Sequence, residues 1–165
     1  MSYTAIVITI SDRSFKGVRK DSSGPALCEM LKENNFEIIG TKLIPDDPDD
    51  IKNTLIWACD TAKADLVLTT GGTGFGTRDN TPEATKAVIE KECPGIPEAM
   101  RAESFKITPY ACLSRETAGI RKQSLIINCP GSEKAAKENF GAVIKAVIHG
   151  LAMVHNIDHE NLKMG

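Results

Sequence analysis

Short apolar runs alternate with helical patterns four times along this chain, and this alternation constrains its fold more than any other feature. Residues Thr4 to Ile10 form a β-branched run typical of a buried strand, and comparable runs recur at Phe36 to Ile44, Leu66 to Thr70 and Ser124 to Asn128. Strands that alternate with helices pair in parallel through right-handed crossovers. The sequence therefore predicts an α/β fold, a three-layer sandwich in which helices cover both faces of a mostly parallel sheet.

Prolines, capping residues and apolar spacing predict the intervening helices. We expect Asp49 or Asp50 to cap the second helix, and Thr81 to cap the third, which should continue to about Glu92. The other expected helices run from Gly24 to about Glu33, from about Pro97 to Phe105, and along a last apolar stripe from Phe140 to Leu151, with a polar tail after about Asn156.

Composition excludes several functional classes. With 20 basic and 22 acidic residues, the chain has a formal net charge of −2 and lacks the basic field of a general nucleic-acid binder. Its 41% hydrophobic and 25% charged residues are typical of a soluble globular protein, and its length suits one domain over residues 1–165. No apolar run is long enough for a signal peptide or a membrane span, so we expect a cytoplasmic protein without a membrane partner.

The cysteines and histidines do not form a metal-binding or disulfide pattern. The number of cysteines is odd and no CxxC pair occurs, so we expect buried free thiols in a reducing cytoplasm. His155 and His159 are spaced like two ligands on one helix face, but no third ligand is nearby, which disfavours a zinc site. The five cysteines are Cys28, Cys59, Cys93, Cys112 and Cys129.

Polar loops follow the carboxyl ends of the predicted strands, which is the edge where open α/β sheets bind their ligands. These loops are Ser11-Asp12-Arg13, Pro45-Asp46-Asp47, Gly71 to Asp79 and Pro130-Gly131-Ser132. Ser132 has no histidine placed as its base, so we expect it to cap a helix or to contact phosphate. Together the loops predict a binding site at one edge of the sheet.

The third loop begins with Gly71-Gly72-Thr73-Gly74-Phe75-Gly76. Glycines allow the backbone to approach a ligand closely and to direct successive amides at an anion. The loop is not a Walker motif, because Thr77 stands where lysine is required, and a GxGxxG frame that starts at Gly72 meets Thr77 instead of glycine. The pattern favours a phosphate-binding loop over a plain glycine-rich turn.

Asp46 and Asp79 are the candidate catalytic carboxylates, since both follow strand ends. Magnesium commonly takes one or two carboxylates and uses substrate phosphates and water for the rest. The alternatives are a solvated turn with a helix cap for Asp46 and an additional cap for Asp79. Near them, Arg13, Arg78 and Arg115 could bind phosphate, because the guanidinium group offers a rigid two-pronged fork.

Several of these motifs together resemble the molybdenum-cofactor biosynthesis family, which includes the bacterial MogA and MoaB proteins and the G domains of gephyrin and its plant counterpart. The resemblance covers nearly the whole chain and is closer to MogA than to MoaB between residues 113 and 123. The matching stretches are Ile10 to Arg13, Leu43 to Asp46, Thr70 to Gly74, Arg78 to Glu83, Leu113 to Arg115, Gly119 to Gln123 and Pro130-Gly131-Ser132.

The resemblance implies a molybdopterin-binding fold, assembled as a homotrimer, that transfers AMP from Mg²⁺-bound ATP to the terminal phosphate of molybdopterin and releases pyrophosphate. The family's essential aspartates match Asp46 and Asp79, which would also hold the metal. A contact with the partner protein that inserts molybdate is a further expectation. The expected substrate- and nucleotide-binding positions are Ser11, Asp12, Arg13, Gly71, Gly72, Thr73, Gly74, Arg78, Arg115, Pro130, Gly131 and Ser132.

Two other functions remain open at this point. A non-catalytic molybdopterin-binding or scaffold protein, like MoaB, would share the fold, although the presence of both aspartates argues against it. A flavodoxin-like FMN binder would share the alternating architecture. Flavodoxins, however, place their phosphate loop after the first strand and flank the flavin with aromatic residues, whereas here the loop follows the third strand and aromatics make up 5% of the chain.

Overall fold

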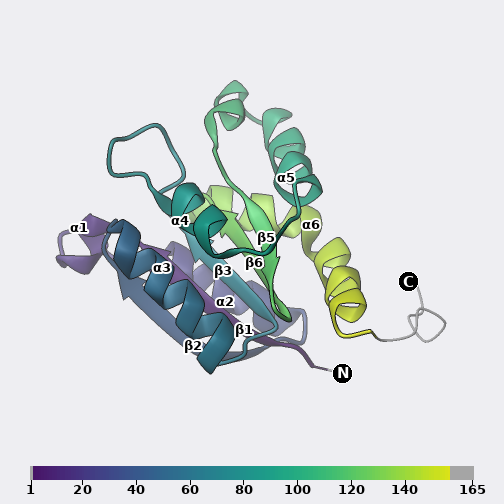
Figure 1. Ribbon diagram of the computed structural model, residues 1–165. Coiled ribbons are helices and arrows are strands. Elements are labelled where there is room, and N and C mark those ends of the chain that lie inside the picture. Colours follow the sequence, from purple (N-terminus) through teal and green to yellow (C-terminus); the bar gives the residue numbers. More distant parts are fainter. Residues whose placement is uncertain (1, 157–165) are drawn as a thin grey trace.

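The four predicted strands form the parallel part of one six-stranded sheet (Figure 1). The computed structural model describes residues 2–156, so His159 and the polar tail beyond Asn156 lie outside the described residues. The sheet has the order β2-β1-β3-β6-β5-β4. Its parallel strands are β1 (Thr4–Ile10), β2 (Glu37–Ile44), β3 (Leu66–Thr70) and β6 (Ser124–Cys129).

Helices cover both faces of this sheet, which confirms the predicted α/β sandwich. Figure 1 shows α3 and α4 in front of the sheet and α2 and α6 behind it. Successive side chains of β1 point to opposite faces of the sheet and so contribute to both layers. Ala5 and Val7 join the core under α2, α5 and α6. Ile6, Ile8 and Ile10 join the core under α3 and α4. The helices are α1 (Asp12–Phe15), α2 (Ser23–Glu33), α3 (Pro48–Ile56), α4 (Thr81–Val88), α5 (Gly95–Phe105) and α6 (Glu133–Val154), with helical turns η1 (Trp57–Thr61) and η2 (Pro109–Leu113).

Two short antiparallel strands were not predicted, and one of them, at Lys91–Glu92, occupies the expected end of a helix. Strand β5 (Ala118–Arg121) pairs with β6, and β4 (Lys91–Glu92) pairs with β5. Helix α4 ends at Val88, so the prediction that it continues to about Glu92 is wrong. The backbone becomes extended at Ile89, and the amide of Glu90 donates to the carbonyl of Ile120 at 2.8 Å, so pairing with β5 displaces the last helical turn.

The starts of two helices also differ from the prediction. The carboxylate of Asp47, rather than that of Asp49 or Asp50, caps α3 by accepting hydrogen bonds from the amides of both later aspartates, each at 3.0 Å. The helix can begin this early because a proline tolerates the first helical position. Thr81 lies inside the first turn of α4, and Asn80 takes the N-cap position without a capping side-chain bond.

All five cysteines are free thiols, but they are not all buried. Cys59 and Cys129 are buried, Cys28 and Cys93 are half-buried, and Cys112 is exposed on η2, so the expectation of burial is wrong for Cys112. Within residues 2–156, no helix combines the length and the apolar character that a membrane span requires.

Candidate active site

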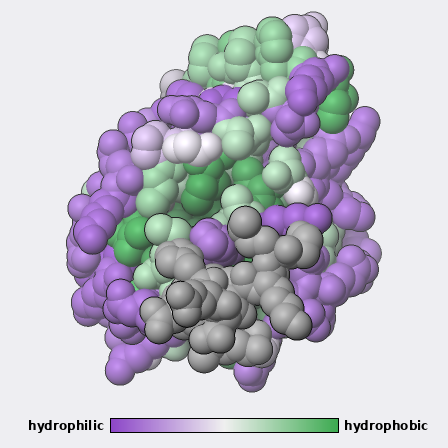
Figure 2. Space-filling view, turned by 90° about the vertical axis from the view of Figure 1, so that its right-hand side faces the viewer, coloured by the Kyte–Doolittle hydropathy of each residue, from purple (hydrophilic) through white to green (hydrophobic). Residues whose placement is uncertain are grey.

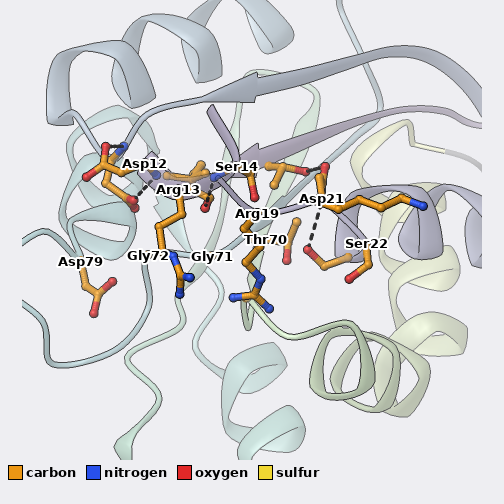
Figure 3. A pocket seen from close by; sticks show the side chains of 17 residues that line it. Asp12, Arg13, Ser14, Arg19, Asp21, Ser22, Thr70, Gly71, Gly72 and Asp79 are labelled. Carbon is orange, nitrogen blue, oxygen red and sulfur yellow. Dashed lines mark hydrogen bonds between the residues drawn. The ribbon is translucent and has the colours of Figure 1, made fainter. Parts of the chain in front are cut away.

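A cavity of about 320 Å³ opens at the carboxyl ends of β1 and β3 (Figure 3). The chain passes from β1 to β2 on one side and then crosses to β3 on the other side of β1, so the strand order reverses between β1 and β3. Ligands in open α/β sheets bind at such a reversal, because the loops that leave it diverge and open a crevice.

The cavity brings together part of the predicted set of residues. Its wall contains Ser11, Asp12, Arg13, Asp46, Gly71, Gly72, Asp79 and Gly131. The predicted residues outside that wall are Thr73, Gly74, Arg78, Arg115, Pro130 and Ser132. Ser132 caps α6 by accepting a hydrogen bond from the amide of Ala135 at 3.3 Å, as one of its two predicted roles required.

Gly71 passes so close to β1 that a side chain could not be accommodated. Its φ is +102°, and an added Cβ would lie 2.2 Å from the carbonyl oxygen of Ile10. The amide of Gly71 is already used, because it donates to the carbonyl of Cys129 at 3.2 Å. The amides of residues 72–74 donate no hydrogen bond within the described part of the chain, and the amide of Gly72, which lies in the cavity wall, is therefore available to an anion.

Two threonines and a second loop hold this backbone from behind. The hydroxyl of Thr81 donates to the carbonyl of Gly71 at 2.9 Å, and the hydroxyl of Thr70 donates to the carbonyl of Pro130 at 2.7 Å. A Cβ on Gly131 would lie 3.3 Å from the Cα of Gly71. These contacts fix the glycine loop at the end of β3 before any ligand arrives.

Asp46 is tied to the neighbouring loop and keeps one oxygen free. Its Oδ2 accepts a hydrogen bond from the amide of Asp12 at 2.8 Å, and its own amide donates to Oδ1 of Asp12 at 3.0 Å. Its Oδ1 lies 3.1 Å from where a Cβ on Gly72 would stand. Burial raises the pKa of Asp46, and the charges of Asp12 and Asp79 raise this pKa further. A cation beside these carboxylates would favour the ionised form.

Asp79 is held within the glycine loop. Its Oδ2 accepts a hydrogen bond from the amide of Gly76 at 2.8 Å, while no described residue donates to its Oδ1. Figure 3 shows Asp79 beyond Gly72 at the edge of the cavity. The negative charge of Asp79 raises the pKa of Asp46, so the two carboxylates interact electrostatically.

Arg115 fastens the glycine loop instead of lining the cavity. Its Nε donates to the carbonyl of Gly74 at 2.7 Å, its Nη2 donates to the carbonyl of Asp79 at 2.6 Å, and its Nη1 pairs with the carboxylate of Glu83. Its amide donates to the carbonyl of Thr73 at 3.0 Å. Every part of the guanidinium group is thus engaged by the loop and by α4.

Arg78 is also paired within the protein. Its Nε and Nη2 donate to the two carboxylate oxygens of Asp12 at 2.9 and 3.0 Å, and these bonds lower the pKa of Asp12. Of the three arginines predicted to face phosphate, Arg13 is the one in the cavity wall, and its side chain has no partner among residues 2–156.

The segment 19–23 also lines the cavity and was missed. Its anchor is Asp21, whose Oδ2 accepts a hydrogen bond from the hydroxyl of Thr9 at 2.7 Å and whose Oδ1 accepts one from the amide of Gly24 at 3.0 Å. The sequence carried a signal for this anchor, since an aspartate three residues before Gly24 at a helix start is typical of a capping turn.

The donor set fits a magnesium ion that is shared with a substrate. Asp46 and Asp79 each keep one carboxylate oxygen free of hydrogen bonds within residues 2–156. In the same part of the chain, no group of three or more His, Cys, Asp or Glu residues could hold a metal by itself. Two carboxylates suit Mg²⁺ when phosphates and water supply its other ligands. In His155, considered above for zinc, the Nε2 atom instead lies 2.9 Å from Oδ1 of Asp65.

Known proteins resemble this chain in both sequence and structure. A family model described as a probable molybdopterin binding domain matches residues 6–150. The molybdopterin adenylyltransferase of Helicobacter pylori strain J99 is 49% identical over 144 residues, which are 86% of this chain and 81% of that protein. The molybdopterin adenylyltransferase of Escherichia coli K12 is 45% identical over 152 residues, 88% of this chain and 77% of that protein.

A solved structure shares the fold over most of the chain. The crystal structure of the molybdopterin biosynthesis enzyme MoaB from Thermus thermophilus superposes with a TM-score of 0.89 at 42% sequence identity. The superposition covers 93% of this chain and 97% of that one.

Proposed function

The chain belongs to the family of probable molybdopterin binding domains, and from this premise we propose that it is a molybdopterin adenylyltransferase of molybdenum-cofactor biosynthesis. It transfers AMP from ATP to the terminal phosphate of molybdopterin and releases pyrophosphate. The observation that carries the proposal is the meeting of Asp46, Asp79 and the free amide of Gly72 at one cavity. The relatives of 45–49% identity that bear this activity in their names support it.

The reaction requires positioning more than proton transfer. An oxygen of the molybdopterin phosphate attacks the α-phosphorus of ATP, and the bond from that phosphorus to the pyrophosphate oxygen breaks. The attacking phosphate is already anionic, so no strong general base is needed. The protein must hold two polyanions in line and offset the charge that collects on the leaving group.

The cavity residues divide this work. The amide of Gly72 holds a phosphate oxygen, and the guanidinium fork of Arg13 binds a further phosphate. We propose Mg²⁺ as the cofactor, held by Asp46 and Asp79; when bound, it neutralises charge on the ATP phosphates and on the departing pyrophosphate. The amides of Asp12 and Gly76 orient the two carboxylates by hydrogen bonds of 2.8 Å each.

The decisive experiment is to incubate the protein with molybdopterin, ATP and Mg²⁺ and to detect adenylylated molybdopterin by mass spectrometry, with pyrophosphate release measured in parallel. We expect one pyrophosphate for each adenylylated product. Binding of molybdopterin without either product would favour the non-catalytic, MoaB-like alternative. The cavity wall within residues 2–156 contains no aromatic side chain to flank a flavin, so nothing in it favours an FMN binder.

The assembly and location complete the proposal. We propose a homotrimer in the cytoplasm, where a reducing environment suits the free thiols. Exposed apolar side chains at the end of α5 and on η2 offer a surface for association between subunits. Figure 2 shows hydrophobic residues at the upper end of the side of the molecule that it draws. Light scattering should give three times the chain mass of 17.8 kDa. Co-purification tests the proposed contact with the molybdate-insertion partner.

A further inference from the structure

Arg13 and Arg19 stand in the cavity wall without protein partners, unlike the other arginines of the chain. Both line the cavity and are exposed, and neither side chain makes a hydrogen bond or an ion pair with any residue from 2 to 156. The remaining arginines, Arg78, Arg101, Arg115 and Arg121, all donate hydrogen bonds to protein oxygens. The wall therefore presents two guanidinium groups that are free to bind an anion.

The backbone brings these two arginines together. The amides of Val18 and Arg19 both donate to the carbonyl of Arg13, at 2.9 and 3.2 Å. Gly17 permits this tight turn, because its φ is +72° and an L side chain rarely adopts that conformation. Figure 3 shows the side chains of Arg13 and Arg19 extending in the same direction into the cavity. The turn thus places two positive charges on the wall of one cavity, where an anion would offset their mutual repulsion.

We propose that Arg19, together with Arg13, forms a clamp for the β- and γ-phosphates of ATP, the group that leaves as pyrophosphate. Two guanidinium forks in the wall of one cavity match two linked phosphates, each of which offers a pair of oxygens. A metal ion held by Asp46 and Asp79 would offset part of the charge on the leaving group, and the two arginines in the wall would offset a further part. This inference rests on the proposed adenylyl transfer.

The test compares the affinities of wild type, Arg19→Gln and Arg19→Lys by calorimetry, with inorganic pyrophosphate, ATP, AMP and molybdopterin as four separate probes. We expect Arg19→Gln to weaken pyrophosphate and ATP about tenfold each, as the loss of a charge-assisted bond of about 1.4 kcal/mol would do. AMP and molybdopterin should bind within a factor of two of wild type. Arg19→Lys keeps the charge but loses the two-pronged fork, so its affinities for pyrophosphate and ATP should lie between those of wild type and those of Arg19→Gln.

The control is Lys145→Gln, which removes one positive charge from the exposed side of α6 at a distance from the cavity. It should leave all four affinities unchanged, and thermal unfolding should match wild type in every variant because Arg19 has no partner to lose. Unchanged pyrophosphate affinity in Arg19→Gln would overturn the clamp, and so would a loss confined to AMP or molybdopterin. Failure of adenylyl transfer is a separate result, which is measured on the wild type. If the wild type is inactive but binds pyrophosphate through Arg19, the proposed function is refuted and the anion clamp still holds.

Discussion

The backbone amides of Asp12 and Asp46 donate hydrogen bonds to each other's carboxylates, at 2.8 Å to Asp46 and 3.0 Å to Asp12. This reciprocal pair joins the ends of β1 and β2 at the rim of the cavity. It holds Oδ2 of Asp46 against the amide of Asp12 and leaves Oδ1 of Asp46 beside Gly72. Asp12 in turn is held by the fork of Arg78. The orientation of a candidate metal ligand thus depends on a residue of another loop.

We expect Asp12→Ala to lower kcat about tenfold and to raise the Mg²⁺ concentration needed for half-maximal activity, because Asp46 loses the acceptor that holds its backbone. Asp12→Asn keeps an acceptor oxygen and should recover part of the loss. Both effects can be read from initial rates in a Mg²⁺ titration. A change in kcat without any change in the Mg²⁺ dependence would argue against this positioning role.

Asp79→Asn should reduce turnover by orders of magnitude while the protein stays folded and still binds molybdopterin. The amide oxygen can replace Oδ2 as acceptor for Gly76, so the loop survives, but the charge that would hold the metal is lost. Asp49→Asn is the matched control, since it removes the same charge from an exposed position on α3. AMP transfer at the wild-type rate by Asp79→Asn would refute the role of this carboxylate.

Gly71→Ala should lower the free energy of unfolding by at least about 2 kcal/mol and weaken phosphate binding. The new Cβ would lie 2.2 Å from the carbonyl oxygen of Ile10, at a φ of +102°. Gly95→Ala serves as the comparison, because a Cβ at that position would meet no atom within 4 Å beyond its chain neighbours and the backbone of its own helix. Urea denaturation of both variants measures the difference. Equal stability of the two would show that the loop can shift to accommodate the methyl group.

Glu116 should make stability depend on pH. Its side chain is 3% exposed, no described residue donates to either carboxylate oxygen, and burial raises its pKa from 4.5 to about 7. Between these values the unfolded chain loses the proton while the folded chain keeps it. The contribution of Glu116 to the free energy of unfolding is therefore fully present below pH 4.5 and declines as the pH rises towards 7. Above pH 7 it levels off, after a total decrease of about 3 kcal/mol.

The measurement is the difference in free energy of unfolding between wild type and Glu116→Gln from pH 4.5 to 8. The amide does not titrate, so other groups cancel in the difference. Wild type should lose stability relative to the variant as the pH rises through this window. A difference that stays constant with pH would mean that Glu116 ionises at its ordinary pKa in the folded protein.

Strands and helices that depend on near neighbours could be predicted from the sequence. The bounds of β1 and β3 were predicted without error, because continuous β-branched runs in buried parallel strands are a local signal. Asp46, Gly71 and Asp79 could be placed at one edge because parallel strands end on the same side of the sheet. Strand β4 escaped prediction, since two residues, Lys91 and Glu92, carry no alternation and are extended through pairing with β5.

The sequence by itself determined the layered α/β architecture, the glycine loop and the edge at which the cavity opens. Tertiary structure alone decided which cations face that cavity. Arg78 pairs with Asp12 across 66 positions, and Arg115 binds the glycine loop across 41, whereas Arg19 is left free by a tight turn that brings it beside Arg13. The physical reason is that strand and helix propensities are set by residues within a few positions, but the partner of a charged side chain is whichever group the completed fold brings within about 3 Å.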